Sequence, residues 1–400
     1  MIKPKIRFKG YQEEWEQRKL GAVAEYRNGK AHENEIDDDG EYIVVNSKFV
    51  STNGEIRKFS SAQNEPLYEN EIAFVLSDVP NGRAIARTFL IDRSGKYTLN
   101  QRIAGITPHE DTDPYYLYIK MNRNAYFLKF DDGNKQTNLS IKDVLNYEDM
   151  YPSYTEQQKI GEYFCDLDHL ITLHHRKCEE MKILKKYMLQ KMFPQNGNSV
   201  PEIRFLGFTE DWEQRKFSEM VTIERGGSPR PIDKFITNDK NGLNWVKIGD
   251  APEQGNYITQ TAEKIRPEGL SKTREVHPGD LILSNSMSFG RPYIMAIDGC
   301  IHDGWLAIRD TKKNFDLKFL CTLLGTDSML NQYKAMAAGS TVNNLNKELV
   351  GGTIIAFPML EEQIKIGDYF TSIDHLITLH QKKCDELRNI KKFMLQNMFI

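Results

Sequence analysis

The sequence carries one stretch twice, first as Asp168-His169-Leu170-Ile171-Thr172-Leu173-His174 and again as Asp374-His375-Leu376-Ile377-Thr378-Leu379-His380. At the same offset of 206 residues, Lys159-Ile160-Gly161-Glu162-Tyr163-Phe164 returns as Lys365-Ile366-Gly367-Asp368-Tyr369-Phe370. A long internal repeat decides the architecture before any local pattern does, because it means that one structural unit is used twice.

A second repeat precedes each of these stretches. Residues 6–19, which end in Trp15-Glu16-Gln17-Arg18-Lys19, return as residues 203–216 at an offset of 197. The segments between the repeats, about 20–150 and 217–355, resemble each other little, and we call them variable regions 1 and 2. Because the offset grows from 197 to 206, variable region 2 is longer by nine residues. A constant frame around unlike inserts favours one scaffold that presents two binding surfaces. The alternative is a duplicated domain whose surfaces have merely diverged.

Apolar residues recur at alternating steps of four and three through 156–193 and 362–399, which is the seam pattern of a coiled coil. Lys185 interrupts the pattern, and Thr155 is the predicted N-cap of the first helix. A helix of this length spans about 57 Å. Two copies in one chain can bury their seams against each other. We therefore predict an antiparallel pair with a variable region at each end and an internal pseudo-twofold repeat. The predicted core positions of the helix pair are Ile160, Phe164, Leu167, Ile171, Cys178, Met181, Ile366, Phe370, Ile373, Ile377, Cys384 and Leu387.

Histidine and cysteine share the seam. His174 and Cys178 are four residues apart on one helix face, a spacing that two metal ligands can use. No further ligand lies nearby in the sequence, so core packing is the preferred interpretation and no metal site is predicted. Cys178 and Cys384 are interpreted as small core hydrophobes.

Composition limits the class of protein. The chain has 400 residues, a net charge of −3 and five scattered cysteines. The charge argues weakly against a nucleic-acid partner, although a basic face can coexist with an acidic one. No apolar run reaches membrane-spanning length and no signal peptide is evident. Reduced thiols and a cytoplasmic location are therefore expected. The predicted segments are 1–152 and 196–358, each a mixed α/β domain, and the helices 153–195 and 359–400, which together make an α+β fold.

Motifs of catalysis are missing from the sequence. It contains no phosphate-binding loop, no dinucleotide-binding glycine motif, no nucleophile elbow and no zinc-protease helix. Asp113-Pro114-Tyr115-Tyr116 is loosely similar to the Asn/Asp-Pro-Pro-Tyr motif of amino-methyltransferases, but it lacks the second proline. We interpret it as a turn entering a helix near 115–129. The chain is predicted to be a binding subunit without catalysis of its own.

Polar loops follow matched strands in the two variable regions. Ile72-Ala73-Phe74-Val75-Leu76 and Leu281-Ile282-Leu283 are predicted buried strands, and a loop containing arginine follows each. Leu99-Asn100-Gln101-Arg102-Ile103-Ala104 aligns with Ile301-His302-Asp303-Gly304-Trp305-Leu306. Arg, Asn and Gln in such loops can read base edges, but Asn, Ser and Gly also favour ordinary turns. The candidate DNA-binding residues are Asn81, Arg83, Asn100, Gln101, Arg102, Lys135, Gln136, Ser284, Asn285, Arg291, His302, Asn343 and Asn344.

The whole chain resembles the specificity (HsdS) subunits of type I restriction–modification systems. The resemblance is carried by the paired Trp-Glu-Gln-Arg-Lys stretches and the paired helices that run from "Glu-Gln-x-Lys-Ile" to "Met-Leu-Gln-x-Met-Phe". It implies that each variable region is a target recognition domain for one half of a bipartite double-stranded DNA site. The helices would measure the spacer between the two halves.

The resemblance also implies partners and cofactors. Two modification subunits would carry S-adenosylmethionine, and two restriction subunits would add translocation and cleavage that depend on ATP and Mg²⁺. The chain itself would bind no cofactor. Two other interpretations stay open: a coiled-coil interaction protein that does not bind DNA, and the specificity module of a fused methyltransferase or nuclease system.

Overall fold

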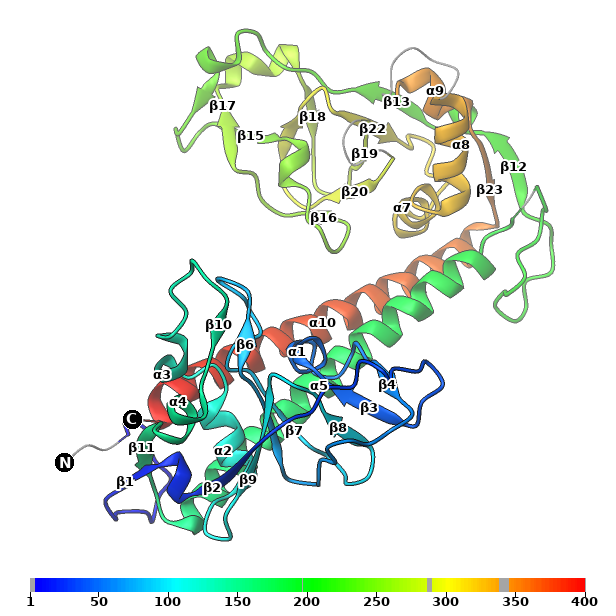
Figure 1. Ribbon diagram of the computed structural model, residues 1–400. Coiled ribbons are helices and arrows are strands. Elements are labelled where there is room, and N and C mark those ends of the chain that lie inside the picture. The colour runs from blue at the N-terminus through cyan, green and yellow to red at the C-terminus, as the bar shows by residue number, and fades with distance from the viewer. Residues whose placement is uncertain (1–3, 196, 286–289, 338–344, 400) are drawn as a thin grey trace. The chain divides into compact units, whose positions relative to one another are not determined.

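The chain folds into two compact units. The computed structural model describes residues 4–195, 197–285, 290–337 and 345–399. Unit 1 comprises Met1–Thr172 and Cys384–Ile400, and unit 2 comprises Leu173–Lys383. Each unit therefore contains one variable region and a part of each long helix, α5 (Tyr154–Lys191) and α10 (Leu360–Met398), both of which are labelled in Figure 1.

Helix α5 begins earlier than its sequence suggests. The carbonyl oxygen of Ser153 accepts hydrogen bonds from the N–H groups of Glu156 and Gln157, both at 3.0 Å, so Thr155 already lies inside the first turn. The predicted N-cap at Thr155 is therefore wrong. Pro152 immediately precedes this start, as expected for a residue that cannot continue a helix.

The two helices pair antiparallel within each unit. In unit 1 the Cys384 thiol faces the carbonyl oxygen of Ile171 at 3.7 Å, and Lys391 binds Asp168 at 2.6 Å. In unit 2 the equivalent contacts recur: Cys178 faces the carbonyl of Ile377 at 3.8 Å, and Lys185 binds Asp374 at 2.6 Å. Residue numbers fall along one helix as they rise along the other. The predicted antiparallel pair is confirmed.

Charge along each helix explains this direction. In residues 154–172 and 360–378, Asp and Glu outnumber Lys and Arg four to one. In the second halves the balance reverses, to six basic and two acidic residues in 173–191 and five and two in 379–398. A parallel pair would bring like charges together, whereas the antiparallel pair sets each acidic half against a basic half.

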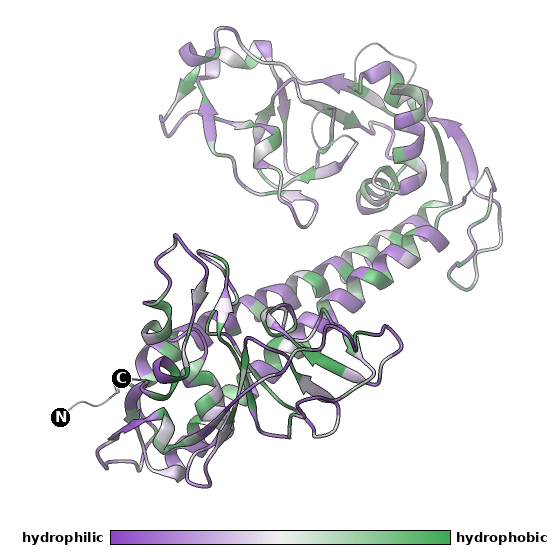
Figure 2. Cartoon of the chain, viewed as in Figure 1, coloured by the Kyte–Doolittle hydropathy of each residue, from purple (hydrophilic) through white to green (hydrophobic). Residues whose placement is uncertain are grey.

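The seam residues are shared with the variable regions. Ten of the twelve predicted core positions are buried, whereas Ile171 and Met181 are partly buried. Within the described residues, Cys178, Ile373 and Ile377 form a buried cluster made by the helices alone. Phe164 packs with Tyr116 of variable region 1, and Phe370 with Phe319 of variable region 2. Figure 2 shows hydrophobic residues recurring between hydrophilic ones along both helices.

The repeated residues 6–15 and 203–212, which we call the docking segments, attach each unit to the long helices. Arg7 donates two hydrogen bonds to the buried carboxylate of Glu156, both at 2.7 Å, and Arg204 binds Glu362 at 2.7 and 2.8 Å. The N–H of Ile6 donates to the carbonyl of Asn397, and the N–H of Ile203 donates to that of Lys191, both at 2.9 Å. The repeated residues 6–15 and 203–212 thus perform the same structural task in both units.

Each variable region is built on two sheets whose strands pair mostly antiparallel, with parallel pairs β3–β8, β15–β21 and β16–β20. In unit 1 the main sheet has the order β2-β9-β5-β7 and a smaller sheet has the order β4-β3-β8. In unit 2 the corresponding sheets have the orders β13-β22-β19-β20-β16 and β14-β17-β15-β21-β18. The unit 1 strands are β2 (Ala24–Asn28), β3 (Tyr42–Val45), β4 (Phe59–Ser60), β5 (Ile72–Val75), β7 (Thr88–Leu90), β8 (Tyr97–Leu99) and β9 (Ile103–Pro108). The unit 2 strands are β13 (Thr222–Arg225), β14 (Ile236–Thr237), β15 (Leu243–Val246), β16 (Tyr257–Ile258), β17 (Glu263–Ile265), β18 (Arg274–Val276), β19 (Leu281–Ser284), β20 (Pro292–Met295), β21 (Gly299–Ile301) and β22 (Trp305–Arg309).

The central strands are apolar throughout because each separates two cores. Along β5, Ile72 and Phe74 enter the core next to the helices, whereas Ala73 and Val75 enter a second core. Along β19, Leu281 and Ile282 divide in the same way. Side chains of a strand alternate between faces, so burial on both sides requires a continuous apolar run.

Shorter elements close each unit. A ribbon of β1 (Glu16–Lys19) and β11 (Glu148–Tyr151) in unit 1 corresponds to β12 (Glu213–Lys216) and β23 (Ile354–Phe357) in unit 2. The remaining unit 1 elements are β6 (Ser77–Asp78), β10 (Thr137–Asn138), α1 (Ser47–Ser51), α2 (Pro114–Met121), α3 (Ala125–Leu128) and α4 (Ile141–Leu145). The remaining helices of unit 2 are α6 (Phe217–Met220), α7 (Leu317–Leu324), α8 (Asp327–Ala337) and α9 (Lys347–Gly352).

The Asp113-Pro114 stretch caps a helix, as predicted. The Asp113 carboxylate accepts a hydrogen bond from the N–H of Tyr116 at 2.7 Å, and Pro114 occupies the first turn of α2. The single helix expected near 115–129 is wrong, because it divides into α2 and α3. Arg123 adopts a φ of 55° between them, and the Asn124 side chain caps α3.

Candidate nucleic-acid interface

Three polar loops meet at one edge of unit 1. The N–H of Leu76 donates to the carbonyl of Arg102 at 3.0 Å, and the carbonyl of Leu76 accepts from the N–H of Leu139 at 2.8 Å. These bonds bring the ends of β5, β9 and β10 together, and with them the loops 77–83, 100–102 and 131–136. The structure therefore gathers all seven candidate residues of variable region 1.

Some of these side chains are held and others are available. Asn81 donates to the carbonyl of Gly133 at 3.3 Å, Gln136 donates to the Ser77 hydroxyl at 2.7 Å, and Gln101 donates to Glu33 at 3.0 Å. Within the described residues, four candidates have side chains without a hydrogen bond or ion pair: Arg83, Asn100, Arg102 and Lys135. Asn100 is partly buried and the other three are exposed. A surface that contacts a ligand needs such unoccupied donors.

Unit 2 builds its edge with the same backbone hydrogen bonds. The N–H of Asn285 donates to the carbonyl of Gly304 at 2.9 Å, and the carbonyl of Asn285 accepts from Leu345 at 3.1 Å. The N–H of Lys30 reaches the carbonyl of Leu99 at 3.0 Å, as that of Gly227 reaches Ile301 at 3.1 Å. The predicted alignment of 99–104 with 301–306 is confirmed.

Two glycines make these turns possible, and sequence reasoning missed both. A Cβ atom on Gly29 would lie 2.1 Å from the carbonyl oxygen of Asn100, and one on Gly226 would lie 2.2 Å from that of His302. Both contacts are with backbone, which cannot move away without disrupting the turn. The available signal was a glycine at the same position after the first strand of each variable region.

Two candidates in variable region 2 lie in the interior of the unit rather than on its surface. The side chains of Ser284 and Asn285 are buried, with exposed fractions of 0% and 1%. The Ser284 hydroxyl accepts from the N–H of Arg291, and the Asn285 amide donates to the carbonyl of Asp303, both at 2.9 Å. They hold the edge together from inside. Asn343 and Asn344 lie outside the described residues.

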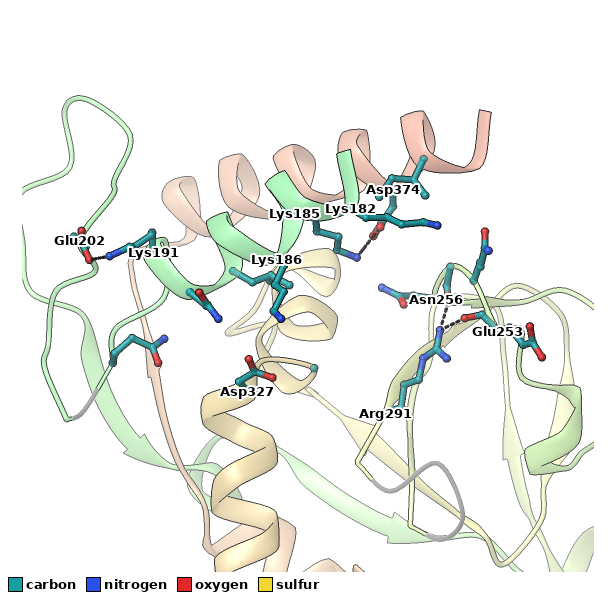
Figure 3. Close-up of a pocket in the computed structure, with 17 residues that line it drawn as sticks. Lys182, Lys185, Lys186, Lys191, Glu202, Glu253, Asn256, Arg291, Asp327 and Asp374 are labelled. Carbon is teal, nitrogen blue, oxygen red and sulfur yellow. Dashed lines mark hydrogen bonds and ion pairs between the residues drawn. The ribbon is translucent and has the colours of Figure 1, made fainter. Parts of the chain in front are cut away.

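The candidate residue Arg291 faces a cleft and is hydrogen-bonded to two backbone carbonyls. Its guanidinium donates to the carbonyls of Glu253 at 2.9 Å and Gly255 at 3.2 Å, as Figure 3 shows. The cleft is about 800 Å³ in volume and lies entirely within unit 2. Its five cationic residues are nearly balanced by four carboxylates, and Lys185 and Lys191 are paired with Asp374 and Glu202. The hydrogen-bond register makes Arg87, rather than Arg83, the equivalent of Arg291, because Val75 and Ser284 donate to their respective carbonyls.

The turn that contains His302 is centred on Asp303. The Asp303 carboxylate accepts a hydrogen bond from the Ser228 hydroxyl at 2.9 Å and lies 3.9 Å from the guanidinium of Arg230. Its backbone carbonyl accepts from Nε of Arg225 at 3.3 Å. Nδ1 of His302 lies 2.9 Å from Asp303 Oδ1. Burial lowers the pKa of His302, which favours the neutral imidazole.

Apolar side chains are exposed at equivalent places on the two helices. In unit 1 these are Leu170, Ile390 and Phe393, and in unit 2 they are the repeat equivalents Leu376, Leu184 and Tyr187. Phe393 is the repeat equivalent of Tyr187, and the two are 56% and 49% exposed. Exposed apolar groups that recur in a duplicated frame indicate contact surfaces. We call these two sets the apolar patches of unit 1 and unit 2.

Searches for metal-binding and membrane-spanning features were negative where the structure is described. Among those residues, no three His, Cys, Asp or Glu side chains are grouped so that they could hold a metal ion. Within the same ranges, no helix combines the length and the apolar character that a bilayer crossing requires.

The duplicated frame, with one polar edge in each unit, defines a protein of two similar units joined by paired helices. The chain belongs to the family of the type I restriction modification DNA specificity domain, whose sequence model matches residues 12–182 and 209–389. Each match contains one variable region and most of the helix that follows it. The predicted family membership is confirmed.

Relatives and solved structures extend over the whole chain. The type I restriction enzyme MjaVIII specificity subunit of Methanocaldococcus jannaschii is 24% identical over 95% of this chain and 91% of its own. The putative MjaX specificity subunit of the same organism is 22% identical over the same shares. The crystal structure of a type I restriction–modification S subunit from M. genitalium has a TM-score of 0.67 at 14% identity, covering 100% of this chain and 99% of that one. A chain from a structural study of type I system assembly and conformational transition has a TM-score of 0.52 at 18% identity, with 97% and 98% covered. The two-domain α+β architecture with paired helices is confirmed.

Proposed function

We propose that this chain is the DNA-specificity subunit of a type I restriction–modification enzyme and reads a bipartite site through one edge in each unit. One observation carries the proposal: the same hydrogen-bonded turn presents Asn100-Gln101-Arg102 in unit 1 and His302-Asp303-Gly304 in unit 2. A shared frame with different polar groups suits two different half-sites, and therefore an asymmetric site.

The chemistry of the edges suits base reading. In the major groove, amide side chains pair with adenine, and guanidinium groups pair with guanine. Arg83 and Arg102 in unit 1 have donors free for such contacts, and Lys135 can contact a phosphate. The net charge of −3 does not oppose this, because charge is distributed by surface rather than averaged over the chain.

The apolar patches are the proposed docking surfaces of two modification subunits. The patches occur once in each unit at equivalent positions, which suits two copies of one partner. In this proposal the partners hold S-adenosylmethionine, two restriction subunits supply the chemistry that needs ATP and Mg²⁺, and the chain contributes no catalytic group. The complex would act in the cytoplasm, where the chromosome lies.

A coiled-coil interaction protein that does not bind DNA is the main alternative. It would need the helices and patches, but not two matched polar edges built around Gly29 and Gly226. A specificity module that works with a fused methyltransferase or nuclease would retain the same edges, and so differs only in how the catalytic partner is attached.

A domain exchange tests the proposal. Residues 20–150 are replaced by the equivalent region of a relative, and the methylated site is mapped in cells that supply the modification subunit. One half of the site should change while the other half and the spacer stay the same. The reciprocal exchange of 217–355 is the matched control and should change the other half. If both halves change together in either chimaera, the modular assignment is wrong.

A further inference from the structure

The turn in unit 2 holds two arginines around Asp303, one at its backbone carbonyl and one at its carboxylate. Arg225, at the end of β13, and Arg230 both face Asp303, in the turn between β21 and β22. Both arginines are exposed, and Arg230 has 73% of its side chain exposed. Neither was singled out from the sequence. The pairing of β13 with β22 brings Arg225 next to Asp303, which is 78 residues away in the sequence.

These contacts leave most of the guanidinium donors of Arg225 and Arg230 unoccupied within the described residues. Arg225 donates through Nε to the Asp303 carbonyl, and within the described residues its two terminal nitrogens have no partner. Arg230 approaches the Asp303 carboxylate through one nitrogen only, at the long distance of 3.9 Å. Two parallel donors of a guanidinium match O6 and N7 of guanine, the commonest specific contact in the major groove. An exposed ion pair of this length adds little stability, so folding does not explain the arrangement.

Asp303 is itself fixed. Its carboxylate accepts from Ser228 at 2.9 Å, and its carbonyl accepts from the buried Asn285 amide at 2.9 Å. The turn is thus anchored from the interior, and the carboxylate is presented at a defined place. Unit 1 has Gln101 at the equivalent position, where it donates to Glu33 at 3.0 Å. The carboxylate that faces Arg230 at this position of the turn is therefore particular to unit 2.

We propose that Arg225 and Arg230 read guanine in the half-site that unit 2 recognises, and that Asp303 positions them. This inference rests on the proposed function and specifies the chemistry of one half of the site. Arg225 and Arg230 contact the base edge, whereas Asp303 is a positioning residue that acts through them.

The test uses the full chain assembled with its modification subunit. Preferred duplexes are selected from a random library, and binding is then measured on the selected site and on single-base variants. R225Q and R230Q should each relax a G·C position in the unit 2 half-site, with discrimination falling roughly 5- to 150-fold. The other half-site should be unchanged. R215Q removes the same charge from β12, away from the turn, and should leave both halves intact.

Two further variants separate base reading from a phosphate contact and from a structural role. R225K and R230K keep the charge but lose the planar fork, so they should fail to restore discrimination. D303N keeps the backbone carbonyl that Arg225 contacts but neutralises the carboxylate that faces Arg230, so it should lower discrimination at the position that R230Q relaxes. Affinity for random duplex should stay equal or rise, because a negative charge next to DNA has been removed. A turn that is only structurally damaged would lose both the discrimination and the affinity for random duplex.

The outcomes distinguish this inference from the proposed function. If R225Q, R230Q and D303N all retain the wild-type site, the inference is overturned while the proposed function stands. Full rescue by the lysine variants would assign the arginines to phosphates and overturn guanine reading. If the wild-type complex selects no sequence at all, the proposed function fails instead.

Discussion

The Nδ1 atoms of His174 and His380 lie 3.0 Å apart in the seam of the helix pair. The two residues occupy the same position in the repeat, so the equivalent residues face each other. At this distance the Nδ1–H of one ring donates a hydrogen bond to Nδ1 of the other. Protonation of both rings would place two cations in contact. Burial and the neighbouring His380 lower the pKa of His174, and Lys177 on α5 and Lys383 on α10 add to the effect.

The histidine pair makes the free energy of unfolding depend on pH. Because the pKa of folded His174 lies below its ordinary value of 6.5, the unfolded chain binds the proton more readily. The free energy of unfolding should therefore fall as the pH drops below 6.5 towards the lowered pKa. The variant H174L should flatten this dependence in urea unfolding at pH 7.5, 6.5 and 5.5. H175L changes an exposed neighbour and should keep the wild-type slope. An unchanged slope in H174L would contradict the assignment.

The ion pair between Lys185 and Asp374 fixes the seam in unit 2. Both side chains are about one quarter exposed, at 26% and 28%. The variant K185D sets two carboxylates against each other and should lower the unfolding free energy by about 1–3 kcal/mol. Adding D374K should recover most of that loss. R176D reverses the charge of an exposed pair with Glu180 and should cost much less. The double variant decides: if it is no more stable than K185D, the pair does not act as a unit.

Glycine at position 226 should be required for the turn. G226A places a methyl group 2.2 Å from the carbonyl of His302 and should cost about 1–3 kcal/mol through overpacking. Recognition of the unit 2 half-site should weaken with it, while the unit 1 half-site is preserved. In the same unit, Gly249 has open space for a Cβ atom, so G249A is the matched control. Equal thermal unfolding of the two variants would refute the required close approach.

The apolar patches should be needed for partner binding rather than for folding. Y187S and F393S remove exposed aromatic groups, so the stability of the chain alone should change little. Each should weaken association with the modification subunit by about 1–2 kcal/mol, roughly 5- to 30-fold in Kd. L206S alters a side chain that is 98% exposed and lies outside both helices, and it should bind the partner normally. Normal binding by Y187S and F393S would place the partner elsewhere.

If the helices set the length of the DNA spacer between the two half-sites, lengthening both helices should lengthen the spacer. An insertion of four residues into the loop 193–199 would not test this, because Ile203 returns to the carbonyl of Lys191 and the loop would bulge without lengthening the helices. Seven residues should instead be inserted after Thr172 in α5 and after Lys383 in α10, which preserves the heptad phase. The helices grow by about 10.5 Å, or roughly three base pairs. A constant spacer in an active variant would show that the distance is set in another way.

The helices could be predicted almost completely from the sequence, because a seam is a local periodic signal repeated twice. The direction of pairing was also available in the charges: acidic residues gather in the first half of each helix and basic residues in the second. Lys185 looked like a defect in the seam because its partner, Asp374, is 189 residues away. Ion pairs of that kind have no local signature.

The location of the polar edges could be predicted from the sequence, but the orientation of their individual side chains could not. Ser284 and Asn285 looked like loop residues, yet β19 continues through Ser284 and buries both side chains. Arg225 and Arg230 looked ordinary because their relation to Asp303 depends on pairing between β13 and β22. Which polar side chain faces outward is decided by strand ends and register, and these exceed the precision of a periodicity argument.

The contact of the docking segments has a consequence for the covalent integrity of the chain. In unit 2 the bond between Ile203 and Lys191 joins residues that are 12 apart, whereas in unit 1 the same bond joins Ile6 to Asn397, which are 391 apart. Unit 1 thus forms this junction without a short tether. The bond between Ile203 and Lys191 therefore does not require an unbroken peptide between Phe193 and Ile203. A chain cut there would lose effective concentration, but it would keep every contact that makes the junction.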